Sequence, residues 1–239
     1  MSLKIDLHLH TLASAHAYST VYEYIQEAKR QKMIAIAITD HGPALNDSPH
    51  PWHFLNMNAL PNRIDGIRIL KGMEANIYKD GTIDCDAQSA IQLDFIMAGF
   101  HAPLYPPNMD LIQNTNCLLK VISNPLVRII SHPGNANYPV DYEVIAEAAA
   151  HHHVALEVNS GSATARKGST DNCRRIIRAV RNAGGFISVG SDAHYCSNVG
   201  NLEHSISLLA EQNFPNSRII NSSLALTLSF LEVDEALHW

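Results

Sequence analysis

The segment Leu3-Lys4-Ile5-Asp6-Leu7-His8-Leu9-His10 is a strand-like apolar run that ends in two histidines. Because successive side chains of a β-strand point to opposite faces, His8 and His10 are expected to project to the same side. Asp6 shares their parity. It could lie one layer deeper and orient an imidazole ring, or it could be a buried carboxylate with hydrogen bonds of its own.

Similar apolar runs recur along the whole chain. They lie at residues 3–9, 33–39, 67–73, 95–100, 127–130, 154–158 and 186–189, with a weaker run at 218–221. Strands that alternate with helices imply a parallel sheet, and about seven strands in one chain favour a closed or distorted β/α barrel. A doubly wound sheet is the alternative, but no glycine-rich nucleotide-binding motif follows any of the runs.

Helix signals fill many of the intervals. Thr20-Val21-Tyr22-Glu23 is a capping box that predicts a helix to about Gln31, and Asp141 predicts a helix over residues 142–151. Asp171 is expected to begin a helix that Gly184-Gly185 stops, and Asn201 one that ends before Pro215. Residues 42–61 are expected to form a long loop with one helix at most. No linker divides the chain, so we expect one α/β domain over residues 1–239.

The composition narrows the class of protein. Charged residues make up 17% of the 239 residues, and the net charge is −6. Proteins that bind nucleic acid usually carry a basic surface that neutralises phosphates, so we do not expect a nucleic-acid partner. No apolar run approaches the ~20 residues of a membrane span, and no signal-type segment opens the sequence. The four cysteines form no CxxC pair, so we expect a reducing, cytoplasmic setting. A homo-oligomer is possible, but nothing in the sequence supports one.

Histidine is abundant, with 14 copies against 17 Lys and Arg, and half of the histidines follow the predicted strands or lie close to one. Six of the seven strands end in residues that ligate metals: His8 and His10, Asp40 and His41, Glu74, His101, His132, and Asp192 with His194. The remaining strand ends in Asn159, which could bind a ligand or substrate. In a β/α barrel these ends meet at one face. Imidazole and carboxylate groups are ligands of zinc, manganese and iron, and such a cluster would be costly without cations.

Six motifs carry a resemblance to a known family. They are His8-Leu9-His10 with His16, Thr39-Asp40-His41-Gly42, Gly72-Met73-Glu74-Ala75-Asn76, Ala98-Gly99-Phe100-His101, Ile130-Ser131-His132-Pro133-Gly134-Asn135 and Gly190-Ser191-Asp192-Ala193-His194. The chain resembles the PHP (polymerase and histidinol phosphatase) superfamily along nearly its whole length, and most closely its bacterial YcdX-type metal-dependent phosphatase branch. The resemblance implies the PHP fold, a distorted seven-stranded β/α barrel. It also implies phosphoesterase activity and three divalent metal ions, usually zinc, with manganese or iron as alternatives.

The resemblance also implies how the ligands divide. His8, His10, Glu74 and Asp192 would hold the first metal, and Glu74 would bridge to a second metal completed by His101 and His132. His16, His41 and His194 would hold the third. No ligand position is missing.

The expected function is hydrolysis of small phosphate monoesters. Phosphate-monoester hydrolysis can need up to ~10²¹-fold acceleration, and one general acid or base supplies only about 10²–10⁴ of it. We therefore expect several cations and a metal-bound hydroxide to supply most of the acceleration. A phosphodiesterase or nuclease, a histidinol phosphatase and a metal-binding regulatory module are the alternatives. The acid that protonates the leaving group is not identified, although a metal-bound water could serve.

Other residues carry open expectations. Arg166 and Lys167, in a loop at residues 161–168 that departs from the family pattern, could contact substrate phosphate or could be solvated. Asp40 precedes a glycine and could ligate a metal or make local hydrogen bonds. His50 and His53 lie in the long loop, which could cover the site or be a mobile surface loop. The remaining histidines are expected to lie on the surface: His151, His152, His153, His204 and His238. The first three are expected at a helix C-terminus, where imidazolium suits the helix dipole.

Overall fold

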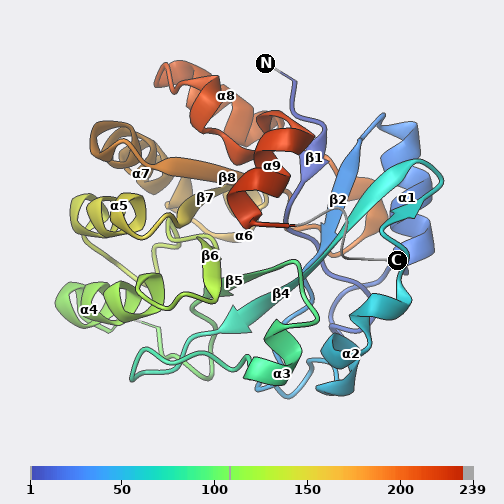
Figure 1. Ribbon diagram of the computed structural model, residues 1–239. Helices are drawn as coiled ribbons and strands as arrows, with labels where there is room; N and C mark the ends of the chain where they lie inside the picture. Colours follow the sequence, from blue (N-terminus) through green and yellow to red (C-terminus); the bar gives the residue numbers. More distant parts are fainter. Residues whose placement is uncertain (1, 108, 234–239) are drawn as a thin grey trace.

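The computed structural model describes residues 2–107 and 109–233, and it has a curled parallel sheet at its centre (Figure 1). Seven strands are paired in the order β1-β2-β4-β5-β6-β7-β8, all parallel, and a short β3 pairs with β4 in antiparallel fashion. The strands are β1 (Ile5–Asp6), β2 (Ala35–Ile38), β3 (Arg63–Ile64), β4 (Ile67–Asn76), β5 (Phe95–Gly99), β6 (Val127–Ile130), β7 (Ala155–Asn159) and β8 (Phe186–Gly190). The expected distorted seven-stranded barrel is confirmed.

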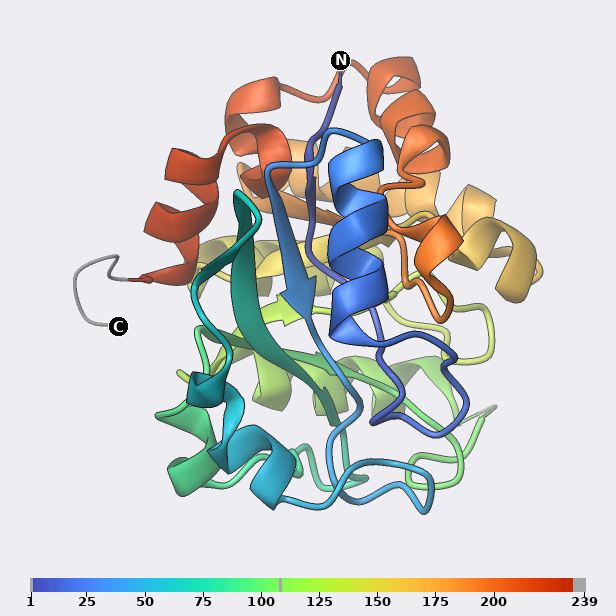
Figure 2. The ribbon, with the colours of Figure 1, turned by 90° about the vertical axis from the view of Figure 1, so that its right-hand side faces the viewer.

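Helices surround the barrel. They are α1 (Val21–Arg30), α2 (Trp52–Leu55), α3 (Ala87–Ala90), α4 (Leu111–Ile122), α5 (Tyr142–His151), α6 (Ser162–Ala165), α7 (Ser169–Ala183), α8 (Glu203–Glu211) and α9 (Leu224–Leu231). Short 3₁₀ turns are η1 (Met57–Ala59), η2 (Cys196–Asn198), η3 (Asn216–Arg218) and η4 (Ile220–Ser222). Figure 2 shows α1 lying against β2, and the loops that follow β1 and β2 at the same end of the molecule. Within the described ranges, no helix has the length and apolarity needed to cross a bilayer.

Two apolar layers hold the sheet and its helices together. The inner layer fills the barrel near the start of the strands with Ile5, Leu7, Leu70 and Met97, and α9 closes that end with Phe230 and neighbouring residues. The outer layer packs the opposite faces of the strands against α1, α4, α5, α7 and α8. Because the inner layer occupies the beginnings of the strands, their ends are free to carry polar side chains.

The barrel closes incompletely between β1 and β8, and a buried asparagine spans the gap. Asn221 Nδ2 donates to the carbonyls of Ile5 (3.0 Å) and Val189 (2.7 Å), while its Oδ1 accepts from the Val189 amide (2.8 Å). Nearer the strand ends, the amide of His10 donates to Ala193 O, and that of Asp192 to His8 O. The prediction of a weak strand at 218–221 is wrong, because the 3₁₀ turns η3 and η4 occupy this segment. Ile219 forms one isolated parallel β-bridge with Ile187 of β8.

The helix signals predict starts and ends well. Thr20 and Glu23 form the expected capping box, Asp141 caps α5, and Gly184 ends α7 with φ +77°. Two helix starts differ from the expected ones by two residues. Helix α7 begins at Ser169 and not at Asp171, directly after Gly168 with φ +87°, and α8 begins at Glu203 and not at Asn201. The long loop after β2 contains α2 and η1.

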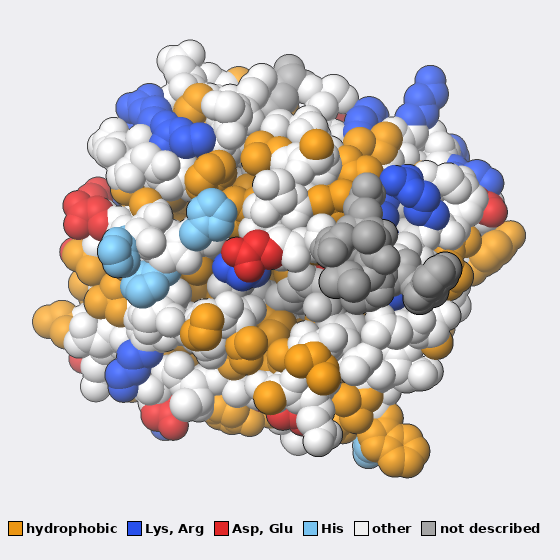
Figure 3. Space-filling model, in the orientation of Figure 1, with side chains coloured by type: hydrophobic (Ala, Val, Ile, Leu, Met, Phe, Trp, Pro, Cys, Tyr) orange, Lys and Arg blue, Asp and Glu red, His pale blue; other side chains and the backbone are white. Residues whose placement is uncertain are grey.

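The surface histidines lie away from the strand ends. His151, His152 and His153 are exposed where α5 ends, just before β7 begins, and a group of histidines is visible on that face in Figure 3. The His153 ring packs against Phe230 of α9, with centroids 4.4 Å apart. This agrees with the expected placement at a helix C-terminus. His204 is half-buried and its Nε2 lies 3.3 Å from Thr170 Oγ1, and His238 falls outside the described residues.

Candidate metal centre

The nine side chains expected to ligate metals come together at the ends of the parallel strands. Glu74 lies within β4, and the others follow directly after strands or lie in the loop between β1 and α1: His8, His10, His16, His41, His101, His132, Asp192 and His194. Three groups have ligand atoms within 4.8 Å of one another, namely His8 with His10 and Glu74, His41 with Glu74 and His101, and His10 with His41 and His194.

Glu74 is the centre of the cluster. Its Oε2 lies 3.3 Å from His8 Nε2, 3.4 Å from His10 Nε2 and 3.1 Å from His41 Nδ1. Its Oε1 lies 2.8 Å from His132 Nε2 and 3.4 Å from His101 Nε2. One fully buried carboxylate thus faces five imidazole rings, which is the position expected of a bridging ligand.

Asp192 and His16 complete the two sides of the cluster. Asp192 Oδ1 lies 3.2 Å from His10 Nε2 and 3.5 Å from His8 Nε2. The ring of His16 lies 5.1 Å from that of His41 and 4.8 Å from that of His194, measured between centroids. The side chain of His16 is 44% exposed, so this side of the cluster opens to solvent.

The polar atoms of this cluster fit a divalent cation. Both oxygens of Glu74, and Nδ1 of His10 and of His41, are buried without a hydrogen-bond partner among the described residues. Leaving buried polar atoms unpaired costs about 1–3 kcal/mol each, and more for charged groups, unless an ion or water partners them. Imidazole and carboxylate without thiolate form the donor set of zinc, manganese and iron sites.

The protonation states also suit ligation. Burial, together with the nearby His41, lowers the pKa of His10 to about 3. Burial lowers the pKa of His101 to about 4, although Glu74 opposes this. Burial alone would raise the pKa of Glu74, but the imidazoles of His8, His101 and His132 hold it well below its usual range. Neutral imidazoles, as at His10 and His101, and an ionised carboxylate are the forms that bind metals. His8 and His41 differ, because nearby carboxylates outweigh their burial and raise their pKa values.

The backbone is strained at two of these positions. His132 has φ +31° and Asp192 has φ +56°, in a region that residues other than glycine seldom adopt. Such conformations cost on the order of 1–3 kcal/mol and persist where the surrounding structure holds them, commonly at functional sites. Both side chains are thereby directed at the cluster.

Three further residues orient the imidazole rings, and the sequence analysis did not single them out. Glu157 Oε1 lies 2.8 Å from His8 Nδ1, Asn76 Oδ1 lies 2.8 Å from His101 Nδ1, and Asp47 Oδ2 lies 2.6 Å from His16 Nδ1. A partner of this kind fixes which ring nitrogen faces a metal. For Glu157 a signal existed: it is a charged residue inside the apolar run of β7, two residues before Asn159.

Asp6 is a buried carboxylate with its own hydrogen bonds and does not orient an imidazole. It accepts from the amides of His8 (3.4 Å), Ser191 (2.9 Å) and Gly200 (2.9 Å). Asp6 and His8 do not face the same side, because regular pairing of β1 ends at Asp6 and the alternation of faces does not continue beyond it. Leu7 lies in the inner layer, and the next residue, His8, also reaches Glu74. Asp6 thus fixes the segment that carries Asp192.

Asp40 is likewise held by hydrogen bonds, but they are not local. It accepts from the amide and hydroxyl of Thr11 (2.7 and 2.8 Å) and from the Ser14 hydroxyl (2.8 Å), which orders the loop that carries His16. His53 Nε2 lies 3.2 Å from Asp40 Oδ2, so the half-buried His53 contacts the residue that orders this loop. His50 is exposed.

A cleft of about 320 Å³ leads to the cluster. His16, His41, His101 and His132 form part of its lining, together with Arg166. Arg166 Nη1 donates to Asp192 Oδ2 and Ser162 Oγ, both at 3.0 Å, whereas Lys167 is exposed and does not line the cleft. Asn159 Oδ1 accepts from the Ser162 amide (2.8 Å) and its Nδ2 lies 3.3 Å from Asp192, so it orders this same corner.

The chain is similar to known proteins along most of its length. The model of the PHP domain family matches residues 6–223. The chain is 51% identical over 230 residues to a probable phosphatase of Yersinia enterocolitica, YE2421, and 49% identical to the probable phosphatase YcdX of Escherichia coli; each match covers 95% of this chain and 94% of the relative.

Solved structures agree on the fold. A histidinol phosphate phosphatase of Lactococcus lactis, in complex with zinc, L-histidinol and phosphate, superposes with a TM-score of 0.66 at 18% identity, covering 90% of this chain and 95% of that one. A putative histidinol phosphatase of Listeria monocytogenes gives 0.63 at 17% identity, covering 82% and 97%. The expected family and the expected phosphatase class are confirmed, and the chain belongs to the PHP domain family.

Proposed function

We propose that this protein hydrolyses phosphate monoesters of small molecules at a site for three divalent ions, most simply zinc. His8, His10, Glu74 and Asp192 would hold the first ion. Glu74, His101 and His132 would hold the second, and His16, His41 and His194 the third. The observation that carries the proposal is Glu74, a fully buried carboxylate that faces five imidazoles and whose two oxygens lack a hydrogen-bond partner in the described chain.

Bound divalent ions supply Lewis-acid chemistry, polarising a phosphoryl oxygen and lowering the pKa of water. The side chains of this protein supply the geometry. Glu157, Asn76 and Asp47 hold three imidazoles in fixed orientations through their second ring nitrogens. Such outer partners are typically worth 10–100-fold in metal affinity or activity.

Arg166 is proposed to bind the substrate phosphate. It is the one Lys or Arg that lines the cleft among residues 2–107 and 109–233, and its bonds to Asp192 and Ser162 fix its position. A guanidinium presents several donors in a planar fork that matches phosphate oxygens. Arg166 would therefore orient the phosphoryl group beside the metal ligands.

The charge distribution favours monoesters over nucleic acid. Proteins that bind nucleic acid neutralise several phosphates with Lys and Arg, whereas this cleft offers one arginine and the chain carries a net charge of −6.

The proposal also includes a single functional domain and a cytoplasmic location.

The test is phosphate release by the metal-loaded protein from a panel of small monoesters that includes L-histidinol phosphate, run beside a fluorescent oligonucleotide. We expect release from monoesters and an intact oligonucleotide. Faster digestion of the oligonucleotide would favour the nuclease alternative, and turnover of L-histidinol phosphate far above every other monoester would favour a histidinol phosphatase. No turnover of any ester would support a metal-binding module instead.

A further inference from the structure

The cleft outside the metal cluster has a distinctive chemical lining. Beyond the histidines and Arg166, its polar side chains are Asp47 and three asparagines, Asn46, Asn135 and Asn137. Its volume of about 320 Å³ lies at the lower end of the range for small-molecule sites. The part of a substrate that extends beyond the phosphate would therefore meet amides and one carboxylate.

The charges in this lining disfavour a second anion. Arg166 is already bonded to Asp192, and its position beside the cluster directs it to the reacting phosphate. Asp47 pairs with His16 at 2.6 Å and its side chain is 45% exposed, so it presents negative charge toward the opening. A second phosphate or a carboxylate on the substrate would meet Asp47 without a free cation to partner it.

The amides provide both donors and acceptors. Asn46 and Asn137 are exposed and Asn135 is half-buried, and Asn135 Oδ1 accepts from the Asn137 amide (3.1 Å), which fixes that side chain. Together with Asp47, these groups can bind hydroxyl or amino donors. They match an alcohol that is rich in such donors.

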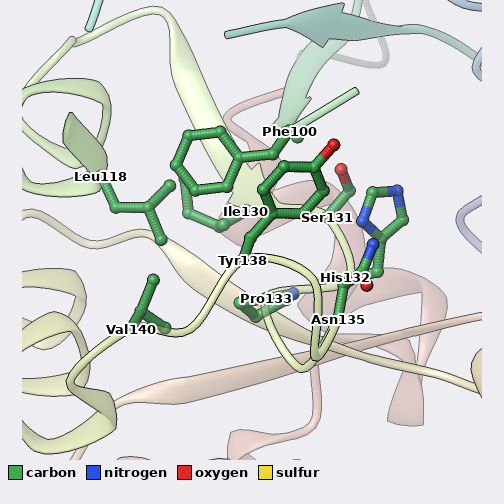
Figure 4. Close-up of a pocket in the computed structure, with 10 residues that line it drawn as sticks. Phe100, Leu118, Ile130, Ser131, His132, Pro133, Asn135, Tyr138 and Val140 are labelled. Carbon is green, nitrogen blue, oxygen red and sulfur yellow. The ribbon is translucent and has the colours of Figure 1, made fainter. Parts of the chain in front are cut away.

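One wall of the cleft is aromatic. Figure 4 shows the rings of Phe100 and Tyr138 side by side next to His132, and their centroids are 5.2 Å apart. Tyr138 is largely buried and its hydroxyl donates to Tyr105 O (3.2 Å), so it offers the cleft an apolar contact and no free hydrogen-bond donor. Behind this wall the enclosed space is about 10 Å³, room for roughly one water, so a long leaving group cannot extend there.

We propose that this cleft selects esters whose alcohol is small, carries hydroxyl or amino donors, and bears no second phosphate or carboxylate. The inference rests on the proposed phosphatase function and specifies its substrate class. The alcohol would bind to Asn46, Asn135, Asn137 and Asp47, with its carbon skeleton against Tyr138. Selection against anions then comes from Asp47 and from the lack of an unpaired cation among the described residues that line the cleft.

Matched substrate pairs test the selection directly. The metal-loaded protein is assayed on glycerol 3-phosphate against 3-phosphoglycerate, and on fructose 6-phosphate against fructose 1,6-bisphosphate. Because like charges placed together oppose binding, kcat/KM is expected to fall by about tenfold or more on adding the second anion. Equal or faster turnover of the doubly anionic member in both pairs would overturn the inference.

A charge variant tests the location. Asn137→Lys places a cation at the opening and is expected to raise the relative kcat/KM for the doubly anionic esters by about two- to fivefold, the range of a surface ion pair. The gain should shrink as salt is added. Asn182→Lys is the matched control, because Asn182 is exposed near the end of α7, at the opposite end of the barrel. An equal gain in both variants would overturn the proposed location.

Failure of the proposed function and failure of the proposed selectivity give different results. If no ester in the panel releases phosphate, the proposed function fails, and this inference fails with it. If the esters are hydrolysed but the second anion makes no difference, only the proposed selectivity fails.

Discussion

Glu157 Oε1 lies 2.8 Å from Nδ1 of His8, although the two residues are 149 positions apart in the chain. The second oxygen of Glu157 accepts from the His132 amide at 2.7 Å. One buried carboxylate from β7 therefore orients an imidazole that follows β1 and fixes the backbone after β6. The expected metal ligands depend on this residue, which is not expected to be a ligand itself.

Glu157→Gln should weaken metal binding without removing it. Both oxygens of Glu157 accept hydrogen bonds, and a glutamine amide has only one accepting oxygen. The variant therefore loses the bond to His8 or the bond to the His132 amide, as well as the charge that makes His8 a better donor to a metal, and we expect about 10–100-fold lower metal affinity. A competition titration with a chelator measures this. Glu143→Gln, on the exposed surface of α5, is the control, and equal affinity of the two variants would refute the role of Glu157.

His41→Ala should abolish most of the activity and leave the fold intact. The His41 ring follows β2 and its Nδ1 is buried without a hydrogen-bond partner in the described part of the chain, so the strand does not depend on it. Phosphate release and the circular dichroism spectrum are compared with those of His151→Ala, at the exposed end of α5. Full turnover by His41→Ala would contradict its placement in the site.

Glu74→Gln should lose both metal binding and part of the stability of the metal-free fold. In chelated protein we expect a lower free energy of unfolding, because the imidazoles that hold the pKa of Glu74 below its usual range stabilise its charge in the folded state. In wild type, free metal at 100 times its Kd should add about 2.7 kcal/mol for each site that it fills, or roughly 5–10 °C in Tm per site. Thermal melts with and without metal measure both effects. A metal-induced rise in the Tm of Glu74→Gln as large as in wild type would show that Glu74 is not a ligand.

Asn221→Ala should destabilise the fold far from the site. The substitution leaves the Val189 amide and the carbonyls of Ile5 and Val189 without their side-chain partner at the barrel gap. At about 1–3 kcal/mol for each unsatisfied buried group, we expect a loss of about 3 kcal/mol or more. Urea unfolding compares it with Ser222→Ala, its exposed neighbour. A loss below about 1 kcal/mol would mean that the gap closes without Asn221.

The sequence predicts the strands and the convergence of their ends, since both follow from local patterns. Six of the seven apolar runs end in a ligand-type residue, and a parallel barrel brings such ends to one face. Thr20, Asp141 and Gly184 mark helix ends because capping is a matter of a few neighbouring residues.

The remaining features depend on contacts between distant segments. The segment at 218–221 has strand-like residues, but it fills the gap beside β1 through an asparagine side chain, and no local pattern reveals that gap. Asp47 lies in a loop that gives no sign of its partner His16. Asp6 has the parity of His8 but faces the segment after β8, because regular β1 pairing ends at Asp6.

The most direct test of the central claim is a titration of zinc into fully chelated protein, with release of inorganic phosphate from a small monoester as the readout. We expect no release without metal and a rise that continues until about three equivalents per chain are bound. Release that is independent of metal, or that saturates below two equivalents, would contradict the proposed three-ion site.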